Sequence, residues 1–193
     1  MASFIRYLTH PQVQVDAMVP VPDWSLSGQG RTRVGRFARA SCLAATTAIV
    51  SSGERKAKET AAIIADALGL TVSVRTGMHE NDRSGTGFLP PAEFEITANA
   101  FFAQPESRIR GWERAGDAQR RIVAEFKAVV ALAVTGDLLI VGHGAVGTLL
   151  YCHLAGLPID RSYDQPTGGG CIFTLSSADC SIVHSWRSIE DMA

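Results

Sequence analysis

Residues 138–141 (Leu-Leu-Ile-Val) are apolar at every position and lead directly into Gly142-His-Gly144. A strand that alternates apolar and polar residues has one face in water, whereas a strand without polar positions is covered on both faces. Parallel sheets have this property, because the helices that connect their strands pack on both sides of the sheet. The segment therefore predicts an α/β protein with a mostly parallel central sheet.

The remaining sequence alternates between strand and helix patterns. Strands are expected at residues 4–9, 47–50 and 71–74, with a final hairpin at the sheet edge formed by residues 171–175 and 181–186. Helices are expected from Ser27 to about Leu43, from a Ser51–Glu54 capping box to Gly69, at 92–103, and from Gly144 to about Gly156. A further long helix is expected before residue 138, with Ile122, Phe126, Val129, Val130 and Ala133 at helical spacing. We predict a three-layer sandwich with helices on both faces of the sheet.

Periodicity is lost between about residues 77 and 116, which contain polar and Gly/Pro-rich stretches. The chain has no repeat and no convincing linker, and 193 residues suit one core. We therefore expect a single domain, 1–193, with a cap inserted at about 77–116.

Overall composition excludes several functional classes. Lys and Arg (18) nearly balance Asp and Glu (19), which argues against a dedicated binder of nucleic acid or anionic membranes. No apolar run approaches the roughly 20 residues of a membrane span, and the N-terminus has no signal-peptide core. The four cysteines show no metal-ligand spacing and are expected to be reduced thiols. A cytoplasmic protein is the expectation.

Polar residues with catalytic potential follow several predicted strands, where open α/β sheets place their ligands. His10 follows the first strand, Lys56 lies after the second, Glu80 lies beyond the third, and His143 follows the apolar fourth. A neutral imidazole is a competent nucleophile at pH 7, and helix N-terminal amides bind phosphoryl oxygens. A carboxyl group can protonate a leaving oxygen. The set suits phosphoryl transfer.

Five motifs, in order over nearly the whole chain, resemble those of the histidine phosphatase (phosphoglycerate mutase-like) superfamily. They are Phe4-Ile-Arg-Tyr-Leu-Thr-His10-Pro, Trp24-Ser-Leu-Ser-Gly-Gln-Gly30, Ser51-Ser-Gly-Glu-Arg-Lys56-Ala-Lys-Glu-Thr60-Ala, Met78-His-Glu80 and Leu139-Ile-Val-Gly-His143-Gly. The resemblance implies a phosphoglycerate mutase-like fold and a phosphatase that works through a phosphohistidine.

The same resemblance assigns roles to individual residues. It implies that His10 is phosphorylated during turnover, that Glu80 donates the proton, and that His143 helps to hold the transferring group. Lys56, the Gly144 amide and the Thr9 hydroxyl are expected to bind the phosphoryl oxygens. No metal or organic cofactor is expected, and the substrate is expected to be a small phosphorylated metabolite or a phosphoprotein.

Three departures from the family pattern weaken the phosphate clamp. The arginine and glycine that flank the family's first histidine are Thr9 and Pro11 here, and the arginine of the second motif is Lys56. Guanidinium groups hold phosphate at two points, whereas lysine is a point charge and threonine carries none. Four arginines are candidate replacements: Arg31, Arg33, Arg83 and Arg121.

Substrate selection is expected in the insertion. Apolar surface there comes from Phe94, Phe101, Phe102 and Trp112, most of which are expected to pack the cap onto the core, and charge comes from Arg108, Arg110 and Arg114.

Three alternatives stay open. A family member with the same fold could bind a phosphorylated ligand or a protein partner without turnover. Gly142-His-Gly144-Ala-Val-Gly147 matches the G-x-G-x-x-G turn of dinucleotide-binding oxidoreductases, with Asp160 or Asp164 about 20 residues on, although no strand is expected in 157–170. A metal site built from His10, His79, Glu80 and His143 is the third, although no metal-binding helix motif is present.

Overall fold

The computed structural model describes residues 3–132 and 135–192, and its centre is one six-stranded sheet. The strands are β1 (Phe4–Thr9), β2 (Thr46–Ser52), β3 (Val72–Arg75), β4 (Asp137–Gly142), β5 (Cys171–Ser176) and β6 (Ile182–Ser188), in the order β3-β2-β4-β1-β5-β6. β1 to β4 are parallel, whereas β5 runs antiparallel to β1 and β6 antiparallel to β5. The predicted mostly parallel sheet with an edge hairpin is confirmed.

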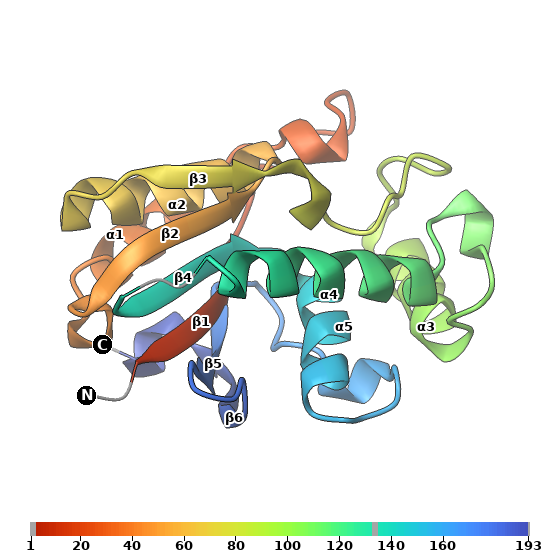
Figure 1. The fold of residues 1–193 in the computed structure, drawn as a ribbon. Coiled ribbons are helices and arrows are strands. Elements are labelled where there is room, and N and C mark those ends of the chain that lie inside the picture. The colour runs from red at the N-terminus through yellow and green to blue at the C-terminus, as the bar shows by residue number, and fades with distance from the viewer. Residues whose placement is uncertain (1–2, 133–134, 193) are drawn as a thin grey trace.

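Helices cover both faces of this sheet (Figure 1). They are α1 (Gly28–Phe37), α2 (Arg55–Leu68), α3 (Pro91–Ala103), α4 (Ala115–Val130) and α5 (Gly144–Leu154). One apolar cluster joins α1 and α2 to the sheet, and a second joins α4 and α5 to its other face. The predicted three-layer sandwich is confirmed. Ala133, which was expected in the fourth helix, lies outside the described residues.

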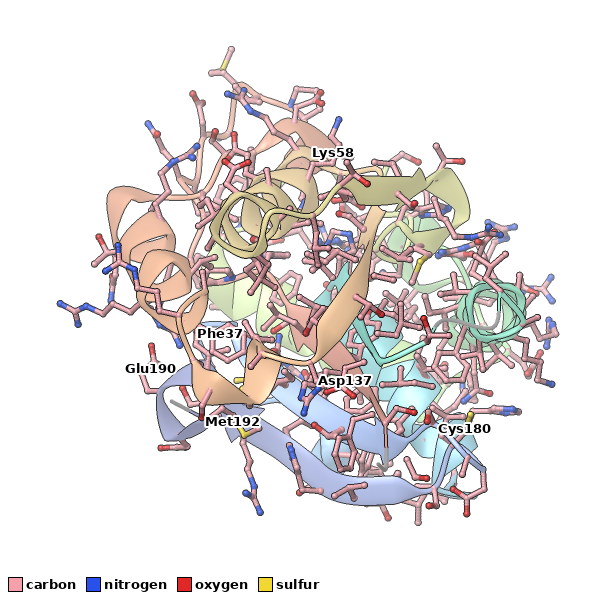
Figure 2. All side chains as sticks on the ribbon, turned by 60° about the vertical axis from the view of Figure 1, so that its left-hand side comes forward. Phe37, Lys58, Asp137, Cys180, Glu190 and Met192 are labelled. Atoms are coloured by element: carbon pink, nitrogen blue, oxygen red, sulfur yellow. The ribbon has the colours of Figure 1, made fainter. Side chains whose placement is uncertain are left out.

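β4 lies in the middle of this arrangement. Its burial is complete along its length, as its uninterrupted apolar sequence requires. Leu139 and Val141 face the cluster with α1 and α2, whereas Leu138 and Ile140 face the cluster with α4 and α5. At the amino end of β4, Asp137 (labelled in Figure 2) pairs with Arg6 at 2.5 Å and accepts the Phe4 N–H at 2.8 Å. The end of the sheet with this ion pair lies opposite the site described below.

Two local predictions at helix ends are wrong. The helix expected from Ser27 to Leu43 ends at Phe37, and a separate 3-10 turn (Ser41–Leu43) follows, although Val34, Phe37 and Leu43 are all buried as expected. Phe37 thereby lies near the C-terminal 3-10 turn that carries Glu190 and Met192 (Figure 2).

The capping box at Ser51–Glu54 does not form. β2 continues through Ser52, which places Glu54 at the N-cap of α2 with no capping hydrogen bond from its side chain. The Glu54 carboxylate turns instead toward the carboxyl end of the sheet. At the other end, α2 stops at Gly69 as expected, and this glycine adopts the left-handed conformation, with φ of 66°.

The segment between β3 and α4 carries α3 and lies beyond the carboxyl ends of the parallel strands (Figure 1). Its loop at 82–87 is tied to the turn at 109–113. Glu113 N donates to Asp82 O at 2.9 Å, and Trp112 Nε1 donates to Thr86 Oγ1 at 2.8 Å. All four cysteines are free thiols. Within residues 3–132 and 135–192, none of the helices has the length and apolar character needed to cross a bilayer.

Candidate active site

The carboxyl ends of β1, β2 and β4 border a cavity of about 420 Å³. Its walls combine the strand ends, the N-terminus of α5, the cap segment and the loop before β5. The polar side chains that line it are His10, Gln12, Lys56, Glu80, Asn81, Arg83, Arg161, Asp164 and Gln165. Phe94, Phe101, Phe102 and Trp112 form much of the apolar wall. The topology thus gathers residues that are far apart in the sequence.

His10 is held in one tautomer. Its Nδ1 lies 2.9 Å from the Pro11 carbonyl oxygen, and because a carbonyl only accepts, Nδ1 carries the hydrogen and Nε2 keeps its lone pair. Burial, with the nearby charge of Lys56, lowers the pKa of His10 to about 4. At neutral pH the ring is therefore uncharged and nucleophilic.

His143 is the partner ring at the start of α5. The centroids of the His10 and His143 rings are 5.3 Å apart, and His143 is fully buried. Its Nε2 is 2.8 Å from Ser52 Oγ, whereas its Nδ1 is buried with no hydrogen-bond partner in the described part of the chain. Burial lowers the pKa of His143 to about 3, despite the nearby carboxylates of Glu54 and Glu80.

Glu54 links the other charged groups of the site. One carboxylate oxygen accepts the Glu80 N–H at 2.8 Å and lies 3.8 Å from His143 Nε2, and the other pairs with Lys56 Nζ. Burial favours a raised pKa for Glu54, but the adjacent His143 and Lys56 outweigh it and lower the pKa to about 2. Lys56 Nζ also donates to Val21 O at 2.8 Å. Two of its three N–H donors are thus committed within the protein.

Glu80 reaches the N-terminus of α5. Its carboxylate accepts N–H groups from Val146 at 3.0 Å, Ala145 at 3.3 Å and Asn81 at 3.1 Å. The Gly144 N–H, one residue earlier, makes no hydrogen bond within the described residues and borders the cavity. The carboxylate is held against the helix end beside His10, in contact with the cavity.

Thr9 differs from its expected role. Its hydroxyl donates to Gln165 Oε1 at 2.5 Å and accepts the Cys171 N–H at 3.0 Å. Its single hydrogen is therefore already used, and a direct hydrogen bond from Thr9 to a phosphoryl oxygen does not fit this geometry.

Of the four candidate replacement arginines, Arg83 alone lines the cavity. The other three form ion pairs at 2.7 Å: Arg31 with Glu59, Arg33 with Glu190 and Arg121 with Glu113. Arg83 has no ion pair within residues 3–132 and 135–192, and its guanidinium lies 5.3 Å from the Phe94 ring centre and 5.7 Å from that of Trp112. Arg108, Arg110 and Arg114 do not line the cavity.

Several residues of the site were not foreseen from the sequence: Ser52, Glu54, Gln165 and the glycines 168–170. The three glycines all have positive φ, and Gly170 N donates to His10 O at 3.1 Å. A Cβ at Gly169 would lie 2.4 Å from the same carbonyl oxygen. Three consecutive glycines before a strand are the one local signal, since only glycine tolerates both the conformation and the contact.

The G-x-G-x-x-G motif has a packing explanation. A Cβ at Gly142 would lie 2.2 Å from Tyr7 Oη, and one at Gly147 would lie 2.6 Å from the Tyr7 ring. A Cβ at Gly144 would lie 2.5 Å from Gln165 Nε2. Residues 157–170 contain a 3-10 turn and no strand to present an acidic residue to a ribose. The glycines of this motif therefore make room for the Tyr7 side chain and for Gln165 at the start of α5. The oxidoreductase alternative is not supported.

A metal site is not supported either. Among the described residues, no three His, Cys, Asp or Glu side chains are grouped so that they could hold an ion. His79 Nδ1 lies 2.7 Å from the Glu80 carbonyl oxygen.

Comparisons with known proteins identify the family and the fold. The profile described as histidine phosphatase superfamily (branch 1) matches residues 10–186. No curated protein matches the chain.

Solved structures share the fold over nearly the whole length. A mycobacterial glucosyl-3-phosphoglycerate phosphatase has 25% identity and a TM-score of 0.74, with 97% of each chain covered. Bacillus stearothermophilus YhfR has 21% identity and a TM-score of 0.78, with 94% of each chain covered. An Entamoeba histolytica phosphoserine phosphatase bound to 3-phosphoglyceric acid has 16% identity and a TM-score of 0.77, with 98% of this chain and 99% of that chain covered. With a family profile that spans most of its length, the chain belongs to the histidine phosphatase superfamily.

Proposed function

We propose that the protein is a phosphatase that hydrolyses a phosphomonoester through a phosphohistidine on His10. The observation that carries the proposal is the state of this ring: its Nδ1–H is fixed on the Pro11 carbonyl, and its lowered pKa of about 4 keeps Nε2 unprotonated at neutral pH. A nucleophile needs a free lone pair, and a ring that only bound an anion would gain from being charged.

In the first step, His10 Nε2 attacks phosphorus in line, the bond from phosphorus to the ester oxygen breaks, and Glu80 gives its proton to the departing alcohol. In the second, water attacks the phosphohistidine, the nitrogen–phosphorus bond breaks, and Glu80 takes the proton from water. Inorganic phosphate leaves and His10 is restored. Glu80 borders the same cavity as His10, which supports this role.

Charge on the phosphoryl oxygens is offset by donors at the base of the cavity. The third N–H of Lys56 and the free Gly144 N–H are assigned this part. His143 does not line the cavity; it is fully buried with its ring 5.3 Å from that of His10, and its part in holding the phosphoryl group is assigned from there. No resident metal or organic cofactor takes part in these steps, and a cytoplasmic location remains part of the proposal.

The leaving group is assigned to the cap side of the cavity. A second cavity of about 630 Å³ adjoins the first and shares Val21, Glu80, Asn81 and Arg83 with it. Within the part of the chain that the structure describes, Asn81 Nδ2 is buried without a partner and Arg83, on the same loop, has no ion pair. Two donors without acceptors favour a small phosphorylated metabolite whose alcohol part carries an anionic group.

A second candidate is a family member that binds a phosphorylated ligand without turnover. It is favoured by the pairing of Lys56 with Glu54 and by the attachment of the Glu80 carboxylate to α5. In that case the fold and the cavity would serve recognition alone.

Hydrolysis of 4-nitrophenyl phosphate by the wild type and by His10→Ala separates the two. The phosphatase predicts that the substitution abolishes a measurable wild-type rate. Equal rates in both proteins would exclude the phosphatase function and leave the binding function as the explanation.

A further inference from the structure

We propose that the side-chain amide of Gln165, oriented by Thr9, supplies the phosphoryl hydrogen bonds that the family obtains from the arginine missing at position 9. The inference rests on the proposed phosphatase function and adds to it a substrate-contacting residue and a positioning residue. It starts from the observation that the Thr9 hydroxyl faces Gln165 rather than the ligand.

The Thr9 hydroxyl determines which end of the amide faces which way. Its oxygen accepts the Cys171 N–H at 3.0 Å, and its hydrogen is donated to Gln165 Oε1 at 2.5 Å. Thr9 is fully buried at the end of β1, whereas Gln165 is half-buried at the cavity, so the contact is closed to water on the Thr9 side. With Oε1 fixed on Thr9, the amide nitrogen lies at the other end of the planar group.

That nitrogen lies against the N-terminus of α5. Gln165 Nε2 is 2.5 Å from the position that a Cβ on residue 144 would take, so a side chain there would displace the amide from this position. Gln165, Gly144 and His10 border the same cavity. Nε2 has no acceptor within the described ranges, and its two hydrogens are therefore available beside the free Gly144 N–H.

The backbone of Gln165 is fixed as well. Its N–H donates to Asp164 Oδ1 at 2.7 Å, and the same oxygen accepts the Thr148 hydroxyl of α5 at 2.8 Å. Two residues before Gln165, Tyr163 O accepts the Trp186 indole N–H at 3.1 Å. A donor on a fixed backbone with a fixed amide plane is preorganised, and preorganised donors stabilise a transition state most effectively.

The exchange also explains how the site functions with less charge. The amide offers two neutral N–H donors, so the phosphoryl group is bound by geometry at this position rather than by a cation. Thr9 thereby serves the same phosphoryl group as the family's arginine, but through a second side chain that is 156 positions away in the sequence.

The test compares Gln165→Leu, which removes the amide at similar volume, with Thr9→Val, which removes the orienting hydroxyl, and with the double variant. We expect Gln165→Leu to lower kcat/KM for 4-nitrophenyl phosphate about 100-fold and to weaken inhibition by orthovanadate by a similar factor. Thr9→Val should give a smaller loss, and it should add nothing in the Gln165→Leu background, because residues that act through one another are not additive. Thr9→Ser keeps the hydroxyl and should restore most of the activity.

Thr97→Val serves as the matched control. Thr97 is a buried threonine of α3 that donates to Glu93 O at 2.8 Å and does not line the cavity, so its loss should leave both constants unchanged. If Thr9→Val proves too unstable, the Gln165→Leu and Thr9→Ser variants still decide the matter. Wild-type-like kcat/KM in Gln165→Leu, or additive losses in the double variant, would overturn the inference.

Failure of the proposed function would look different. If the wild type does not turn over at all, calorimetric binding of inorganic phosphate to the wild type and to Gln165→Leu replaces the rate measurement. A weaker affinity in the variant would support the role of Gln165 in an inactive family member, whereas equal affinity would overturn it.

Discussion

Folding stability is expected to fall steeply below neutral pH because both site imidazoles are neutral in the folded protein. Burial and the charge of Lys56 lower the pKa of His10 to about 4, and burial lowers the pKa of His143 to about 3. In the unfolded chain each ring has its ordinary pKa of about 6.5. Below that pH the unfolded chain binds protons that the folded chain does not, so stability is fully present above about pH 6.5 and is lost as the pH falls.

The size of the loss follows from the unfolded state alone, as long as the folded pKa values lie near 4 or below. At about pH 5, protonation stabilises one unfolded imidazole by roughly RT ln(1 + 10^1.5), or about 2 kcal/mol. Both folded rings are still mostly neutral there. The two histidines together are therefore expected to remove about 4 kcal/mol between about pH 7.5 and about pH 5.

Urea unfolding, followed by tryptophan fluorescence at these two pH values, measures the loss in the wild type, His10→Gln and His143→Gln. Each variant should lose about 2 kcal/mol less than the wild type over this interval, whatever its stability at neutral pH. Above about pH 7.5 the three curves should run parallel. If a variant loses as much as the wild type, that imidazole already carries a proton in the folded protein at pH 5, and the argument for a neutral site fails.

Three further outcomes test other parts of the site. Glu80→Gln should lower hydrolysis of an alkyl phosphate by about 10²–10⁴ but that of 4-nitrophenyl phosphate far less, because nitrophenolate leaves without a proton, and equal losses would exclude Glu80 as the acid. Arg83→Met should raise KM at least about tenfold for phosphomonoesters with a carboxylate on the alcohol and little for neutral ones, and an indiscriminate effect would count against the anion subsite. Gly147→Ala would place a Cβ 2.6 Å from the Tyr7 ring, and urea unfolding should show a loss of about 1–3 kcal/mol.

The sheet and its layers could be predicted from the sequence because their signals are local. An uninterrupted apolar run, as at residues 138–141, has few ways to be buried. The same topology rule brought His10 and His143 to one edge, since both end parallel strands that pair directly.

Helix ends were less predictable because tertiary contacts set them. In isolation, the Ser51–Glu54 pattern satisfies a capping box. In the fold, however, β2 pairs with β4 through Ser51 and with β3 through Ser52. Ser51, which would have capped the helix, is therefore part of the strand. The released Glu54 carboxylate then becomes the link between Lys56 and the backbone of Glu80. No local pattern contains this information.

Gln165 was out of reach for the same reason. It lies in a loop without periodicity, and its significance depends on a contact with Thr9 across 156 positions of sequence. The sequence shows the departure from the family pattern at Thr9, but it does not show that Gln165 takes over the role of the missing arginine. The loss of the arginine at position 9 predicts that another group must bind the phosphoryl group. Only the packing of the loop before β5 against the start of α5 identifies that group as Gln165.

The central claim is that His10 carries the phosphoryl group during turnover. Rapid quenching of the wild type with ³²P-labelled substrate, followed by denaturing electrophoresis, tests it directly. The account predicts label on the protein that withstands base, is released by acid, and disappears in His10→Ala while remaining in Gln12→Ala. Label that persists in His10→Ala, or turnover by the wild type without any protein-bound phosphate, would contradict it.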